Sequence, residues 1–123
     1  MTLEELYAEI GGNYQQAIRT MRLDRLIDKH IVKLAQSDLF AKLDEAAAEL
    51  YPDAVFGAVH NIKGTCGNLA LMGFYDKASV LSDEFRKGRP RTMSDDEARA
   101  KIAELMSDFE GIKATILAYA AEK

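Results

Sequence analysis

The stretch PDAVFGAVHNIKGTCGNLAL, residues 52–71, has the pattern of a helix with one buried face. On a projection at about 100° per residue, its apolar side chains fall within roughly 80° of one another. These side chains are Val55, Val59, Ile62, Cys66 and Leu69. Pro52 suits the first turn of a helix, where its missing N–H costs nothing. We therefore expect one helix over residues 52–71, with Gly73 as its stop.

The opposite face of this predicted helix carries a histidine among glycines. The residues within roughly 60° of His60 on the projection are Gly57, Lys63, Gly64, Gly67 and Leu71. A glycine in a helix interior costs about 1 kcal/mol relative to alanine, so three of them put roughly 2–3 kcal/mol at stake. The glycines either admit another helix at close range or clear space for a partner that reaches an exposed imidazole. Their position opposite the apolar face favours the second explanation.

Helical spacing extends over nearly the whole chain, and strand signals are almost absent. We expect residues 1–21 to form a short helical cap and residues 22–121 to form a helical bundle. Short connections favour an all-α, single-domain fold, an antiparallel up-and-down four-helix bundle. Its rods are expected over residues 22–50, 52–71, 73–88 and 94–121. Ser37 and Asp38 fall inside the first rod, where they either begin a new helix or kink a continuous one.

Composition excludes several classes of function. The chain has 123 residues, with 16 Lys and Arg against 20 Asp and Glu, and its net charge of −4 argues against nucleic-acid binding. A single cysteine permits neither an internal disulfide nor a thiolate metal cage. The apolar run near residues 69–74 is far shorter than the ~20 residues of a membrane helix. Because the N-terminus lacks the basic region of a signal peptide, we expect a cytoplasmic chain. The net charge of −4 and the single domain are compatible with a monomer, which we expect.

The segment His60-Asn61-Ile62-Lys63-Gly64 resembles the motif of the histidine-containing phosphotransfer (HPt) domain family. That motif reads histidine, any residue, an aliphatic residue, lysine and glycine, followed by small residues. The continuation over residues 65–69 also fits, although the family often has a second glycine where this chain has Ala70. The resemblance covers about residues 22–121, since the family is a four-helix bundle with an exposed histidine midway along one helix.

The resemblance implies a phosphorelay carrier in two-component signal transduction. His60 would accept a phosphoryl group from, and donate it to, aspartates of response-regulator receiver domains, alone or within a hybrid histidine kinase. Mg²⁺ would be held by the partner's receiver domain, and this chain would need no metal or cofactor of its own. No nucleotide-binding loop is present, so we expect no ATP-dependent kinase activity and no enzyme in that sense. The alternative is a helical adaptor that docks receiver or kinase domains without carrying phosphate.

The site residues have separate expected roles. A neutral imidazole is a competent nucleophile, so His60 is the predicted phosphoryl acceptor. Lys63 would stabilise the charge of the phosphoryl group, and Gly64 would give steric access. The residues expected to contact the partner are Gly57, Gly67, Asn68, Phe56 and Leu71. Phe56 and Leu71 either pack under a neighbouring side chain or form part of an apolar docking surface.

Three other features have simpler interpretations. His30 shares a stripe with leucines, so an edge-of-core histidine is favoured over a second phosphorylation site. Cys66 falls on the buried face, and we expect a packed small residue there rather than a metal ligand. The basic segment over residues 86–91 is either a solvated connection or a surface that steers an acidic partner.

Overall fold

The computed structural model describes residues 1–123, which form helices and no strand. In chain order the helices are α1 (Leu3–Ile10), α2 (Tyr14–Met21), α3 (Asp24–Gln36), α4 (Leu39–Glu49), α5 (Pro52–Asn68), α6 (Met72–Glu84) and α7 (Asp95–Ala121). The prediction of an all-α fold is confirmed. None of the helices combines the length and the apolar character that a bilayer-crossing segment requires.

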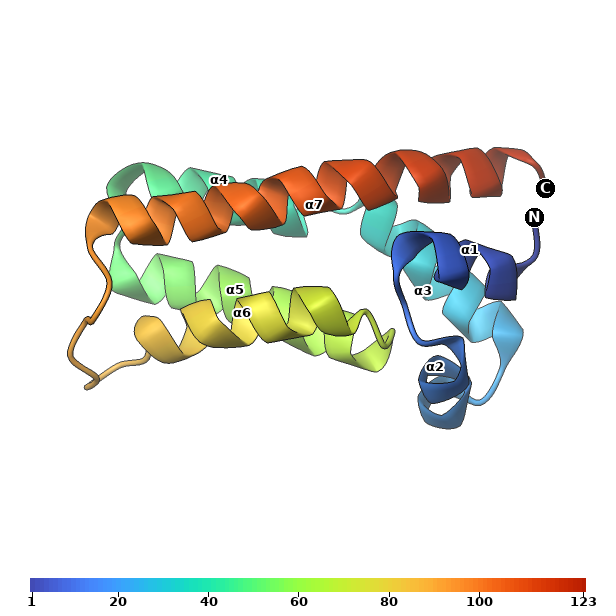
Figure 1. Ribbon diagram of the computed structural model, residues 1–123, viewed down its shortest axis with the longest axis horizontal. Helices are drawn as coiled ribbons and strands as arrows, with labels where there is room; N and C mark the ends of the chain where they lie inside the picture. The colour runs from blue at the N-terminus through green and yellow to red at the C-terminus, as the bar shows by residue number, and fades with distance from the viewer.

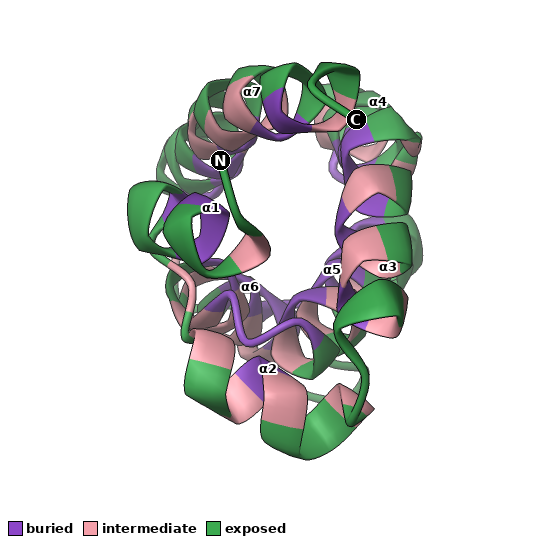
Figure 2. Cartoon of the chain, turned by 90° about the vertical axis from the view of Figure 1, so that its right-hand side faces the viewer, coloured by how far each residue is buried: buried purple, intermediate pink, exposed green.

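Helices α4 to α7 lie side by side and run alternately in opposite directions (Figure 1). α5 packs against α4 and α6, while α7 packs against the same two helices from the other side. Inside, the Phe40 ring of α4 stacks on Phe109 of α7 with centroids 4.0 Å apart, and its edge meets Phe74 of α6. The buried residues lie on the sides of the helices that face the space they enclose (Figure 2), so the outer faces are left for other roles.

Several helices begin at residues whose side chains or ring suit a helix start. The Asn13 side-chain oxygen accepts a hydrogen bond from the N–H of Gln16 at 3.0 Å at the start of α2. The Ser94 hydroxyl accepts one from the N–H of Glu97 at 3.1 Å at the start of α7. Pro52 is the first residue of α5, a position at which a backbone N–H would have no partner within the helix. Local capping thus sets where these helices begin.

The rod predicted over residues 22–50 is wrong as a single unit. The chain forms α3 and α4 instead, with Ser37 and Asp38 between them. Ser37 is extended, with ψ 167°, and its N–H reaches back to the carbonyl of Leu34 at 3.1 Å. Because the chain turns there, α3 packs on α7 and α2 rather than continuing alongside α5. This turn separates α3 from α5.

The end of α5 also differs from the prediction over residues 52–71. The helix ends at Asn68. Ala70 then takes a left-handed conformation with φ 56°, and the N–H of Leu71 bonds the carbonyl of Cys66 at 2.9 Å. Gly73, predicted as the stop of this helix, lies in the first turn of α6 instead. The turn between α5 and α6 is therefore short and closed by the backbone.

α6 ends at Glu84 rather than at the end of the predicted 73–88 segment. The Glu84 carboxylate is only 2% exposed and accepts hydrogen bonds from the N–H groups of Met93 (2.8 Å) and Thr92 (2.7 Å). It also accepts from the Thr92 hydroxyl at 2.7 Å and from Arg91 Nε at 3.3 Å. These bonds, that of Met93 first, lower the pKa of Glu84 from 4.5 to about 2. One carboxylate thus ties the loop before α7 to the end of α6.

The N-terminal helices hold the turn between α5 and α6. The Tyr7 hydroxyl donates a buried hydrogen bond to the carbonyl of Leu69 at 2.8 Å. The N–H of Asn13 donates one to the carbonyl of Ala70 at 2.9 Å. Gly12 lies so close that a Cβ there would be 2.6 Å from the Tyr7 ring, which only glycine avoids. The segment before α3 is therefore packed into the fold.

Candidate functional site

The inner face of α5 is the apolar face that the sequence predicts. Val55, Val59, Ile62 and Cys66 are all buried. Burial raises the pKa of the Cys66 thiol to about 12, so this sulfur remains a protonated thiol inside the protein. No three His, Cys, Asp or Glu side chains gather anywhere in a way that could hold a metal ion. Chemistry on α5 must therefore come from its outer face.

His60 lies on that outer face and is exposed, in agreement with the helical projection. Its ring stacks on Phe56, one turn earlier, with centroids 5.6 Å apart and planes inclined by 16°. Phe56 itself is half-buried. One face of the imidazole therefore rests on a partly anchored aromatic ring, while its edge is open to a partner.

The glycines around His60 fall into two kinds. A Cβ added at Gly57 or Gly64 would meet nothing within 4 Å, so both mark open surface beside the imidazole. A Cβ at Gly67 would lie 3.1 Å from Cδ2 of Tyr75 on α6. Gly67 thus lets the Tyr75 ring approach α5 closely. Close approach of another helix was the less favoured of the two explanations for the glycines in the sequence. The expected contact of Gly67 with a partner stays a prediction.

Lys63 lies one turn from His60 and is half-buried. Its Nζ is 5.5 Å from the centroid of the Tyr75 ring, a cation–π contact. No carboxylate forms an ion pair with Lys63. Its positive charge is therefore held by an aromatic ring and is not neutralised by an acid.

Tyr75 belongs to this site, although the sequence analysis did not find it. The residue lies on α6, and only the packing of α6 on α5 brings its ring against Gly67 and under Lys63. The order of residues in α6 carries no sign of that contact. The one available signal was Gly67, which indicated close packing at this position but not the residue that packs there.

Of the remaining predicted contact residues, one is corrected. Leu71 was placed on the outer face by extending the helix past Asn68, but it is only 1% exposed. It packs in the core because the chain turns at Ala70, so it cannot form a docking surface. Asn68 is exposed, and Phe56 is half-buried under His60. The structure thus groups His60, Lys63, Gly57, Gly64 and Phe56 on one outer surface.

The basic segment over residues 86–91 is partly used within the protein. Arg86 pairs with Asp83 at 2.7 Å, and Arg91 pairs with Asp95 at 3.1 Å while lying over the Phe85 ring. The segment lies at the end of the bundle where α5 begins (Figure 1). Its pairing favours a structural connection over a free basic patch.

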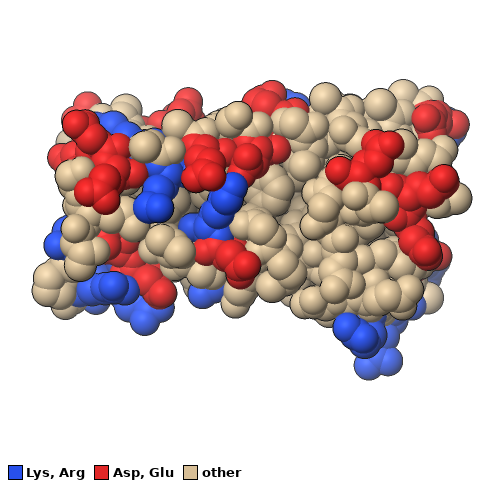
Figure 3. Space-filling model, in the orientation of Figure 1, with Lys and Arg blue, Asp and Glu red and all other residues tan.

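Charged side chains of both signs are interspersed over the face formed by α6 and α7 (Figure 3). There Lys77 lies between two acids, 3.1 Å from Glu104 and 2.5 Å from Asp108. This face therefore carries no large field of one sign that would attract a polyanion.

In comparisons with known proteins, no family model, no curated protein and no solved structure matched this chain. The site must be interpreted from its own geometry and from the motif around His60.

Proposed function

We propose that this protein is a phosphorelay carrier of the HPt kind. In this proposal His60 accepts a phosphoryl group from an aspartate of one receiver domain and donates it to another. The observation that carries the proposal is the exposed imidazole on α5, with open space over Gly57 and Gly64 and an unpaired ammonium group one turn away. Function and partners rest on this arrangement and on the resemblance of residues 60–64.

Three properties of the outer face of α5 support such chemistry. An exposed imidazole can be reached by a group held in another protein's pocket. Open surface over Gly57 and Gly64 lets the backbone of that protein approach the helix. Lys63 supplies a positive charge that no carboxylate neutralises, and such a charge stabilises phosphoryl oxygens. Glycines in a helix interior lower its stability. Their position around His60 is explained if a partner must reach the imidazole.

The proposed transfer step exchanges one bond to phosphorus for another. A ring nitrogen of neutral His60 attacks the phosphorus of an aspartyl phosphate on the partner. A P–N bond forms as the P–O bond to the aspartate breaks, and the carboxylate leaves without needing a proton. In the reverse step an aspartate carboxylate of the second receiver displaces the imidazole. The receiver would bring the Mg²⁺ that neutralises the phosphoryl oxygens.

The arrangement of helices is also consistent with the proposal. The finer description, an antiparallel up-and-down four-helix bundle with a short helical cap, is that of the HPt family. In this description α4 to α7 are the rods, and His60 is the ninth residue of the 17 in α5. A histidine midway along a rod lies far from the helix ends, so a flat partner surface can cover it. A cytoplasmic monomer is part of this proposal.

The test is phosphorylation of the purified chain by potassium phosphoramidate, which needs no knowledge of the partner. Intact-mass measurement should show one added phosphoryl group that is lost in acid and kept in alkali. The His60→Gln variant should gain none, while His30→Gln, a matched control on α3, should behave like the wild type. Phosphorylation that persists in His60→Gln would overturn the assignment.

Onward transfer separates the carrier from the adaptor alternative. The phosphorylated chain, mixed with receiver domains and Mg²⁺, should lose its phosphoryl group to a receiver aspartate, and EDTA should stop the loss. An adaptor predicts instead that His60→Gln still binds a receiver and still signals. Wild-type binding with no phosphoryl movement would favour the adaptor over the carrier.

A further inference from the structure

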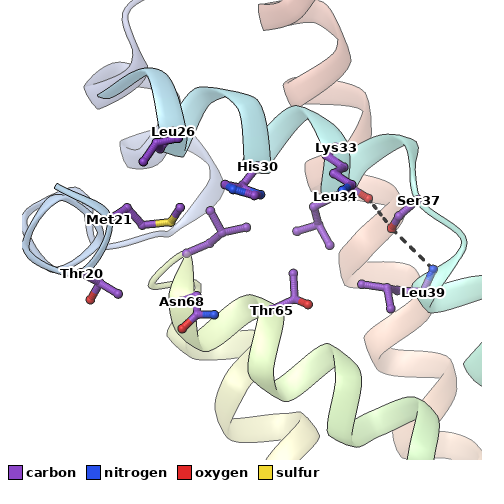
Figure 4. Close-up of a pocket in the computed structure, with 11 residues that line it drawn as sticks. Thr20, Met21, Leu26, His30, Lys33, Leu34, Ser37, Leu39, Thr65 and Asn68 are labelled. Carbon is purple, nitrogen blue, oxygen red and sulfur yellow. Dashed lines mark hydrogen bonds between the residues drawn. The ribbon is translucent and has the colours of Figure 1, made fainter. Parts of the chain in front are cut away.

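A groove of about 690 Å³ lies between α2, α3 and α5 (Figure 4). It exists because the chain turns at Ser37 and Asp38, so that α3 runs against α7 and α2 and leaves α5 uncovered on this side. Its volume is within the roughly 300–1,000 Å³ of ordinary small-molecule sites.

Helix α3 packs one face into the core and leaves part of a second side open to the groove. Ile27 and Ile31 are fully buried. Leu26 and His30 are only half-buried and line the groove, with Leu34 one turn further on. The spacing i, i+4, i+8 aligns them along one side of the helix. Leu26 is thus the accessible apolar side chain on this side of α3, since Leu34 is only 2% exposed.

The opposite wall comes from α5 and the near end from α2. Figure 4 shows His30 and Leu34 pointing from α3 toward α5, Thr65 pointing back from α5, and Met21 entering from α2. Leu69 forms part of the apolar floor. An apolar body of several carbons would contact side chains from three helices at once.

The charge of the groove is one-sided. Its only ionisable lining residues are His30 and Lys33, and no Asp or Glu lines it. Lys33 is exposed and forms no ion pair, in a protein whose net charge is −4. Thr65 and Asn68 add uncharged hydrogen-bonding groups on the α5 side. A negatively charged head group would find a cation here and no acid to repel it.

We propose that this groove binds a small amphipathic carboxylate, with its carboxylate at Lys33 and its apolar body against the half-buried side chains of Leu26 and Met21. The neutral imidazole of His30 can donate one hydrogen bond to the same head group. The groove includes Asn68, one of the residues expected to contact a phosphotransfer partner, but none of its lining residues is His60, Lys63 or a glycine beside them, so binding in the groove does not require phosphotransfer.

The test uses sodium octanoate as the probe and amide NMR spectra of the whole chain. Octanoate should bind saturably, and the shifted signals should cluster on both walls, at residues such as His30, Thr65 and Asn68. Octyltrimethylammonium, with the same tail and the opposite charge, should bind more weakly. The His60→Gln variant should bind octanoate as the wild type does, so failure of the phosphotransfer proposal would leave this result unaffected.

Two matched variants on α3 test the role of charge. Lys33→Gln should weaken octanoate binding about fivefold, as expected for one partly exposed charge pair. Lys29→Gln removes an exposed lysine of the same helix that does not line the groove, and should leave affinity unchanged. Equal effects of the two variants, equal binding of both detergent-like probes, or scattered shifts would overturn the proposal. Shifts on both walls caused by a receiver domain but not by octanoate would assign the groove to protein docking and also overturn it.

Discussion

Replacing Gly64 with alanine tests separately the access of a partner to His60 and the stability of the fold. A Cβ at this position would meet nothing within 4 Å, so the substitution introduces no clash. Alanine is favoured over glycine in a helix interior by about 1 kcal/mol. We therefore expect Gly64→Ala to raise the free energy of unfolding by about that amount.

The shift in melting temperature follows from the size of the chain. At about 2.1 cal/mol/K per residue, the unfolding entropy of 123 residues is roughly 0.26 kcal/mol/K. A gain of about 1 kcal/mol therefore predicts a Tm higher by about 4 °C. Gly111→Ala on α7 is the matched control, since a Cβ there also meets nothing within 4 Å and the position is exposed. Thermal unfolding followed by circular dichroism should show similar gains for both variants.

Phosphotransfer should respond in the opposite way. One extra methyl in a tight contact costs about 1–3 kcal/mol, and about 1 kcal/mol already slows a reaction roughly fivefold. Transfer from phosphorylated His60 to a receiver should therefore be at least about fivefold slower in Gly64→Ala. Gly111→Ala should leave the rate unchanged. Equal transfer rates in the two variants would refute the claim that Gly64 exists for access, and a lower Tm for Gly64→Ala would refute the open geometry itself.

Three further predictions test packing and hydrogen bonding in the fold. Gly67→Ala should fail to stabilise, because its Cβ would crowd Tyr75 at 3.1 Å. In a Tyr75→Ala background the same substitution should gain about 1 kcal/mol in thermal unfolding relative to Tyr75→Ala alone. The lowered pKa of Glu84 contributes stability that is present above pH 4.5 and lost as the pH falls toward about 2. The free energy of unfolding from urea titrations should therefore decrease with falling pH across that window, and this decrease should be smaller in Glu84→Gln. Tyr7→Phe should lower the free energy of unfolding by about 1–3 kcal/mol in urea titration, because the buried carbonyl of Leu69 loses its donor; an unchanged value would mean that water replaces the hydroxyl.

The sequence was a good guide to the buried and exposed faces of α5 because both depend on helical periodicity alone. Val55 and Ile62 are buried, and His60 is exposed, at the spacing that about 100° per residue predicts. The same rule placed Leu71 wrongly, since it assumes that the helix continues. Ala70 ends that regularity with φ 56°, and no glycine marked the position. Periodicity thus predicts direction only as far as the helix lasts.

Contacts between helices could not be predicted from periodicity. Two such contacts matter at the site: the Tyr75 ring under Lys63, and the same ring against Gly67. The turn at Ser37 is a related case, because one residue in an extended conformation redirects α3 by an angle that the sequence does not state. Packing angles depend on many side chains together, so the groove beside α3 became visible only in the structure.

The hydrogen bonds from Tyr7 and Asn13 to the turn after α5 also determine how far the chain can be shortened and still fold. The motif resemblance begins near residue 22, which suggests that the preceding residues are dispensable. Deleting them would remove both donors to the carbonyls of Leu69 and Ala70 and would expose apolar surface at the end of α5. A fragment trimmed to the boundaries of the resemblance would therefore carry His60 on a helix with a frayed end, and its phosphorylation would understate that of the whole chain.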